Sequence, residues 1–73
     1  MTLIPYFTQL EAAAKKAGVS LLQAYLRAGF PDSTYYRHRQ GSHDPRLASA
    51  EKVLRSIATE FEAEYGIPFD HAA

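Results

Sequence analysis

The stretch "GFPDSTYYRHRQG", residues 29–41, gathers polar and aromatic residues between two glycines. An apolar segment with helical spacing precedes it, and Gly29 suits the left-handed conformation that ends a helix. Pro31 cannot continue that helix, because it lacks a backbone N–H donor. The stretch therefore predicts a tight turn at residues 29–30, followed by a short helix over about residues 32–40 that stops at Gly41.

Three more helices flank this stretch. Apolar residues recur at spacings of three and four over about residues 5–17, 21–28 and 46–64. Ser20 and Gln23 have the spacing of a capping box at the start of the second of these helices. Because short connections join the segments, the sequence predicts one all-α domain, a small bundle of four to five helices whose long last helix forms the main wall of the core.

Length and composition narrow the class of protein. The chain has 73 residues, no cysteine and 47% hydrophobic residues, so we expect one small folded domain without disulfides. No apolar run approaches the roughly 20 residues of a membrane span, and the first residues lack a secretory pattern. We therefore expect a soluble cytoplasmic protein without a membrane partner.

Charge is unevenly distributed along the chain, although the formal net charge is zero. All eight Lys and Arg residues lie within residues 1–59, and four of the eight acidic residues lie within residues 60–73. A basic body with an acidic end is compatible with nucleic-acid binding, while solvated charge on ordinary helix faces would give the same pattern.

The end of the chain is unusually apolar for an acidic segment. Tyr65, Ile67 and Phe69 alternate there, and burying each would contribute roughly 1.5–3 kcal/mol. We expect these side chains to be buried either in the domain's own core or across a dimer interface. The sequence is thus divided into a helical domain, residues 1–64, and an acidic and aromatic C-terminal segment, residues 65–73.

The two short helices on either side of Gly29 match the helix-turn-helix pattern, in which a short glycine-containing turn joins two helices. In DNA-binding examples the second helix lies in the major groove. One face of the helix at about 32–40 carries Thr34, Tyr35 and His38, which are placed to pack on the preceding helix. The opposite face is polar, as expected for recognition or for a solvated surface, and carries Asp32, Ser33, Tyr36, Arg37 and Gln40.

These segments resemble the phage repressor/Cro-like family of helix-turn-helix proteins, also called the xenobiotic-response-element family. The resemblance covers about residues 13–58 and rests on "AAKKAGVSLLQAYLRAG", "GFPDSTYYRHRQG" and "DPRLASAEKVLRSIA". Tyr25 stands where a small residue is usual, and His38 where a large apolar residue is common. The resemblance implies a lambda-repressor-like fold and a transcriptional regulator, repressor-like and of phage or prokaryotic type, that binds double-stranded DNA. We also expect a homodimer, because a small domain gains stability from association.

The resemblance also implies which residues contact DNA. The base-contacting candidates are Asp32, Ser33, Tyr36 and Arg37. The phosphate-contacting candidates are Arg39, Gln40, Arg46, Arg27 and Lys16. Arginine is suited to both roles, because its guanidinium pairs with guanine O6 and N7 or with phosphate oxygens. For Asp32 the sequence leaves a second role open, since this residue is also suited to capping its own helix after Pro31.

Other functions have weaker support. "SHD" at residues 42–44 has the residue types of a catalytic triad, but neighbours in sequence cannot form the required chain of hydrogen bonds. His38, His43 and Asp44 fall short of the four ligands of a structural zinc site. We expect no enzymatic activity, metal, cofactor or small-molecule substrate. The alternative to DNA binding is a protein-interaction module on the same scaffold, with the aromatic C-terminal segment engaging another protein.

Overall fold

The computed structural model describes residues 5–41 and 43–69. Helices are the only regular secondary structure in these ranges, and no strand is present in them. The helices are α1 (Tyr6–Ala17), α2 (Leu21–Arg27), α3 (Asp32–Arg39) and α4 (Leu47–Tyr65). Each lies where the sequence predicts a helix, so the all-α prediction is confirmed, with four helices in the described part of the chain.

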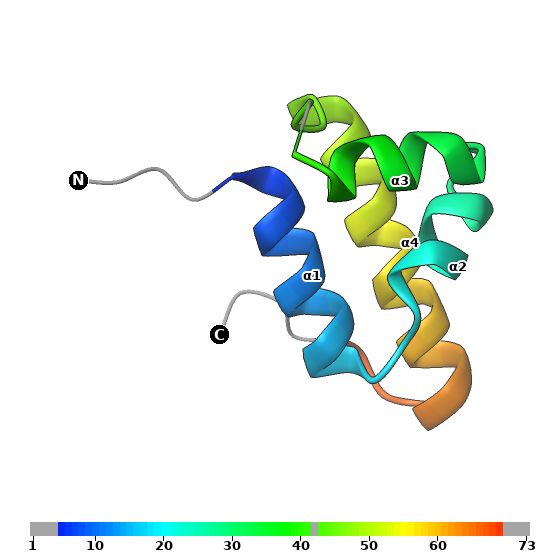
Figure 1. Ribbon diagram of the computed structural model, residues 1–73. Coiled ribbons are helices and arrows are strands. Elements are labelled where there is room, and N and C mark those ends of the chain that lie inside the picture. The colour runs from blue at the N-terminus through cyan, green and yellow to red at the C-terminus, as the bar shows by residue number, and fades with distance from the viewer. Residues whose placement is uncertain (1–4, 42, 70–73) are drawn as a thin grey trace.

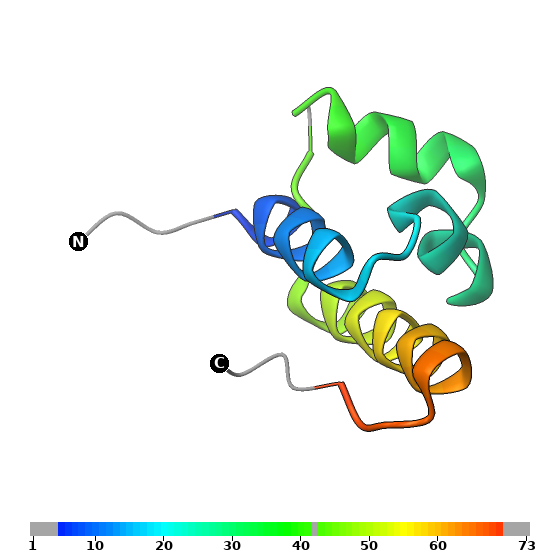
Figure 2. The same cartoon turned by 90° about the horizontal axis from the view of Figure 1, so that it is seen from below.

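The long helix α4 is the wall against which α1 and α2 pack, and α3 packs mainly on α2. Figure 2 shows α1 and α4 side by side, with α3 on the opposite side of the molecule from α4. One apolar core joins these elements. Its buried members are Phe7, Leu10, Ala14, Ala17, Leu21, Ala24, Tyr25, Ala50, Val53, Ile57 and Phe69.

The turn between α2 and α3 depends on Gly29. This residue has φ +95°, a region that side-chain-bearing residues rarely adopt. The backbone N–H of Phe30 then donates to the carbonyl of Tyr25 at 3.0 Å, which closes the end of α2. The predicted turn at Gly29 is therefore confirmed, and Figure 1 shows α3 leaving it in a new direction across the bundle.

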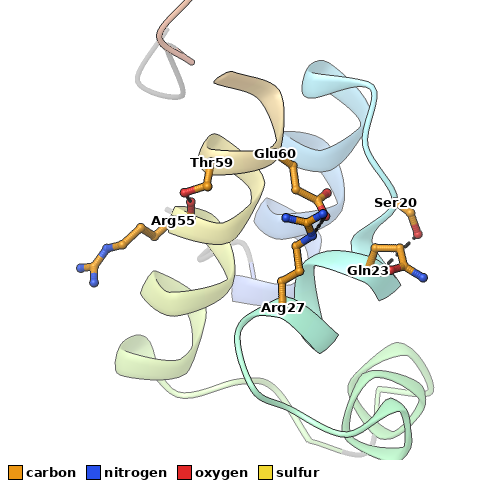
Figure 3. Close-up of polar contacts among 6 residues, drawn as sticks. All are labelled: Ser20, Gln23, Arg27, Arg55, Thr59 and Glu60. Carbon is orange, nitrogen blue, oxygen red and sulfur yellow. Dashed lines mark hydrogen bonds and ion pairs between the residues drawn. The ribbon is translucent and has the colours of Figure 1, made fainter. Parts of the chain in front are cut away.

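Of the two helix caps considered from the sequence, at the starts of α2 and α3, only the one at α2 is present. Ser20 caps α2 as predicted, because its Oγ accepts from the backbone N–H of Gln23 at 3.4 Å (Figure 3). At α3 the N-cap position is occupied by Pro31, without a side-chain capping bond. The capping role considered for Asp32 is therefore wrong. Asp32 is the first residue of α3, where its charge still favours the positive end of the helix dipole.

Within the described part of the C-terminal segment, residues 65–69, Phe69 is the one buried residue. Helix α4 ends at Gly66, and Phe69 then packs against Phe61 with ring centroids 5.0 Å apart and is 7% exposed. Tyr65 and Ile67 stay 55% and 57% exposed. Burial within the domain's own core is thus confirmed for Phe69 and wrong for the other two. The remainder of this segment, residues 70–73, lies outside the described residues, as do residues 1–4.

None of the helices in the described ranges combines the length and the apolar character needed to cross a membrane.

Candidate nucleic-acid interface

Helix α3 has one packed face and one exposed face, as the sequence predicts. Thr34, Tyr35 and His38 are half-buried against the rest of the domain. The residues of the opposite face are all exposed, namely Asp32, Ser33, Tyr36, Arg37 and Gln40. The four candidates for base contact, Asp32, Ser33, Tyr36 and Arg37, therefore lie together on one accessible surface.

An aromatic cluster fixes the packed face of α3 to α2. Tyr25 is 1% exposed and its ring lies 5.5 Å from that of Tyr35 and 5.6 Å from that of His38, centroid to centroid. Phe7 of α1 reaches the same two side chains, at 5.9 Å and 6.4 Å. Since tilted aromatic pairs at such distances add to the free energy gained from burial, this cluster holds the orientation of α3.

A hydrogen bond runs through the middle of this cluster. The phenol Oη of Tyr25 lies 2.8 Å from Nδ1 of His38. Burial, with the negative charge of Asp44 and the nearby Tyr35 phenol adding to it, raises the pKa of Tyr25 to about 12. The phenol therefore keeps its proton, and which of the two groups donates in this bond depends on the tautomer of His38.

This bond connects Tyr25 and His38, two of the positions at which the sequence departs from the pattern of the family that it resembles. Tyr25 is larger than the residue usual at its place, and His38 is more polar than the residue usual at its own. In this protein the polar tip of one satisfies the polar atom of the other, so neither leaves a buried group unpaired.

The environment of His38 favours the neutral imidazole. Burial lowers the pKa of His38 from its ordinary value of 6.5, and the charge of Arg37 and the neighbouring His43 act in the same direction. The negative charge of Asp44 opposes them, with a smaller effect than burial.

We therefore expect the free energy of unfolding to fall as the pH drops below about 7. Because the folded protein has the lower His38 pKa, the unfolded chain takes up more protons once the pH passes below 6.5, and stability is lost down to the pKa of the folded state. Urea unfolding between about pH 7.5 and pH 5 measures this slope. His38→Asn should flatten it. His43→Asn changes an exposed histidine and should leave the slope of stability against pH as it is in the wild type. An unchanged slope in His38→Asn would contradict the assignment of this pH dependence to His38.

Asp44 has a structural role that sequence reasoning missed. Its carboxylate accepts hydrogen bonds from the backbone N–H groups of Tyr6 at 2.9 Å and Phe7 at 3.0 Å. It thereby caps the start of α1, whose N-cap residue Pro5 offers no side-chain acceptor. A cap supplied from 37 residues further along the chain leaves no local pattern. The bond ties the connection between α3 and α4 to α1.

Removal of this cap should destabilise the fold. Asp44→Ala leaves two N–H groups of α1 without their acceptor and is expected to lower the free energy of unfolding by about 1–2 kcal/mol. Asp32→Ala is the matched control, because Asp32 makes no capping bond in the described structure and loses only the weaker dipole interaction. Urea unfolding of both variants measures the two losses in the free energy of unfolding. Equal losses would mean that the Asp44 bonds contribute nothing.

The candidates for phosphate contact fall into two groups. Arg39 ends α3, Gln40 is its C-cap and Arg46 is the N-cap of α4, so these three exposed residues bracket the connection after α3. Lys16 lies in the last turn of α1, an end well separated from α3 in Figure 1. Arg27 reaches from α2 to α4, where its Nε lies 2.7 Å from Oε1 of Glu60 (Figure 3). Arg39 and Gln40 thus lie at the end of α3 and Arg46 at the start of α4, whereas Lys16 and Arg27 lie on α1 and α2, away from the exposed face of α3.

The structure describes two of the three residues considered for catalysis. Asp44 is committed to the backbone of α1 and His43 is exposed, while Ser42 lies outside the described residues.

Comparisons of the chain with protein-family models, with curated proteins and with solved structures find no match.

Proposed function

We propose that the protein is a helix-turn-helix module of the lambda-repressor type that binds double-stranded DNA, with α3 in the major groove, and acts as a transcriptional regulator. The observation that carries this proposal is the asymmetry of α3. One face is fixed to α2 by the Tyr25–His38 bond and its surrounding rings, and the other presents only polar and aromatic side chains to the outside. A short, rigidly held helix with an exposed polar face is what reading of base edges requires.

The proposed base contacts use the exposed face of α3. Arg37 is placed to pair with a guanine, which is the commonest specific contact in the major groove. Ser33 and Tyr36 lie beside it and offer hydroxyl groups, while Asp32 is suited to accept from a cytosine amino group. The residues nearer the start of α3 are those that reach base edges in this docking mode.

The proposed phosphate contacts lie at the other end of α3. Arg39, Gln40 and Arg46 bracket the connection to α4, and such contacts position a protein on the duplex without reading its sequence. Lys16 and Arg27 stay predictions as additional phosphate contacts, with less support because they lie away from this surface. The Asp44 cap supports the arrangement, since it fixes the connection that carries Arg46.

Selection from a pool of random duplexes tests this proposal. The full chain should enrich a common base pattern over successive rounds, and Arg37→Ala should change or weaken that pattern at one position. If no pattern is enriched while the protein remains folded, sequence-specific recognition is excluded. The protein-interaction alternative would then be favoured by the exposed side chains of Tyr65 and Ile67.

A homodimer is part of the proposal, because two-fold dimers match operators with half-sites about 34–36 Å apart. Tyr65 and Ile67 are its proposed contact residues, since they leave more than half of their surface exposed at the end of α4. Sedimentation equilibrium of the full chain at several concentrations should give a mass above that of one chain. Tyr65→Ser with Ile67→Ser should return it to one chain. A monomer at high micromolar concentration without DNA would contradict dimerisation through these residues alone.

A further inference from the structure

A cationic groove lies between the end of α2 and the side of α4, apart from the exposed face of α3. It has a volume of about 410 Å³ and is lined by Arg27, Ala28, Lys52, Arg55, Ser56 and Thr59. Three of these side chains are cationic, two carry hydroxyl groups and none is acidic. The lining therefore has the donor groups and the charge that an anion requires.

Arg27 is held at the edge of this groove by one ion pair. Its Nε lies 2.7 Å from Oε1 of Glu60, whose side chain is only 13% exposed. A guanidinium has five N–H donors, so an ion pair through Nε orients the group without using all of them. With Glu60 counted, the three cations leave a local charge of about +2, which matches the −1.5 to −2 of a phosphate monoester.

Ser56 adds an unsatisfied polar atom to the lining. Its Oγ is buried, and no atom of residues 5–41 and 43–69 forms a hydrogen bond with it. The nearby hydroxyl of Thr59 instead donates to the carbonyl of Arg55 at 2.9 Å, the usual solution for a hydroxyl on a helix (Figure 3). An unpaired buried hydroxyl is costly, and rotation of the Ser56 side chain about χ1 would bring its Oγ to the groove, where it can bond an oxygen atom of a ligand.

We propose that this groove binds the phosphate group of a small phosphorylated ligand. Arg27 approaches from α2, while Lys52 and Arg55 approach from α4 and Ser56 bonds a phosphate oxygen. Figure 3 shows the guanidinium of Arg55 directed away from Arg27, so binding requires this exposed side chain to turn toward the groove. Exposed side chains change rotamer within nanoseconds, which makes this movement easy. The proposal does not rest on the proposed function, because it uses residues away from the exposed face of α3.

Titration of the full, ¹⁵N-labelled chain with inorganic phosphate and with pyrophosphate, followed by amide chemical shifts at matched ionic strength, tests the proposal. Saturable shifts should centre on residues 27–28 and 52–59. The double variant Lys52→Gln/Arg55→Gln should raise the dissociation constant about tenfold or more. The matched control Lys15→Glu, which changes the net charge by the same two units on α1, should leave it unchanged. Shifts that never saturate, or that respond equally to the Lys52→Gln/Arg55→Gln and Lys15→Glu variants, would overturn the proposal.

A second experiment distinguishes binding of a small phosphorylated ligand from binding of the phosphates of a DNA backbone. A random-sequence duplex is added to the same sample in place of the inorganic anions. If saturable shifts at residues 27–28 and 52–59 appear with the duplex alone, the groove is a backbone contact and the small-ligand proposal is wrong. If they appear with pyrophosphate and persist when duplex is added, the proposal stands. If the duplex does not bind to α3, the pyrophosphate result still stands. DNA binding through α3 and phosphate binding in the groove are therefore tested independently.

Discussion

Tyr25→Ala is expected to remove a large part of the stability of this protein. Tyr25 is 1% exposed and its ring contacts those of Phe7, Phe30, Tyr35 and His38. Replacing a buried aromatic residue by alanine typically costs about 3–5 kcal/mol. A domain of this length has a total stability of roughly 4–11 kcal/mol, so the loss consumes much or all of it. The variant also leaves Nδ1 of His38 without its hydrogen-bond partner.

Thermal unfolding followed by circular dichroism measures this effect. Tyr36→Ala is the matched control, because this tyrosine is on α3 with 44% of its surface exposed and should cost less than about 1 kcal/mol. Tyr25→Phe keeps the ring and removes only the hydroxyl, so we expect an intermediate loss of about 1 kcal/mol. A Tyr25→Ala protein as stable as Tyr36→Ala would mean that the aromatic cluster does not hold α3 in place.

Arg37→Ala is expected to weaken binding to a selected duplex by about 1–3 kcal/mol, or roughly 5- to 150-fold, and to relax the preference at one base position. The reason is the loss of a paired contact to guanine from the exposed face of α3. Arg39→Ala should act differently. A phosphate contact positions the protein without reading sequence, so its loss should weaken all duplexes alike and reduce the dependence of binding on salt.

Fluorescence anisotropy with the selected duplex and with a base-substituted duplex separates the two effects. Lys15→Ala, on α1, serves as a charge-matched control, and thermal unfolding verifies that each variant is folded. If Arg37→Ala and Arg39→Ala both bind every duplex as the wild type does, then α3 does not contact DNA and the proposed interface is wrong.

Local patterns were sufficient to predict the helices and the turn. The left-handed glycine at position 29, the Ser20 cap and the polar face of α3 all depend on residues close together in sequence, and all appear in the structure. The division of α3 into a packed and an exposed face follows from the same helical periodicity.

Interactions between distant residues were not predictable in this way. The Asp44 carboxylate caps a helix that begins 38 residues earlier in the chain, and no spacing rule connects the two. The ion pair of Arg27 with Glu60 likewise depends on how α2 crosses α4. Tyr25 and His38 look like two separate anomalies in the sequence, and only the packing of α3 on α2 shows that each satisfies the other.

We propose that this protein binds duplex DNA through the surface of α3, and the salt dependence of binding is the measurement closest to that proposal. Binding of the full chain to a labelled duplex is measured by anisotropy from about 50 to 200 mM salt. Release of counterions by the phosphate contacts of Arg39 and Arg46 predicts that the logarithm of the binding constant falls linearly with the logarithm of salt, with a slope of about −2 for each protein chain. Absence of binding at the lowest salt, or binding that does not change with salt, would contradict DNA binding through α3.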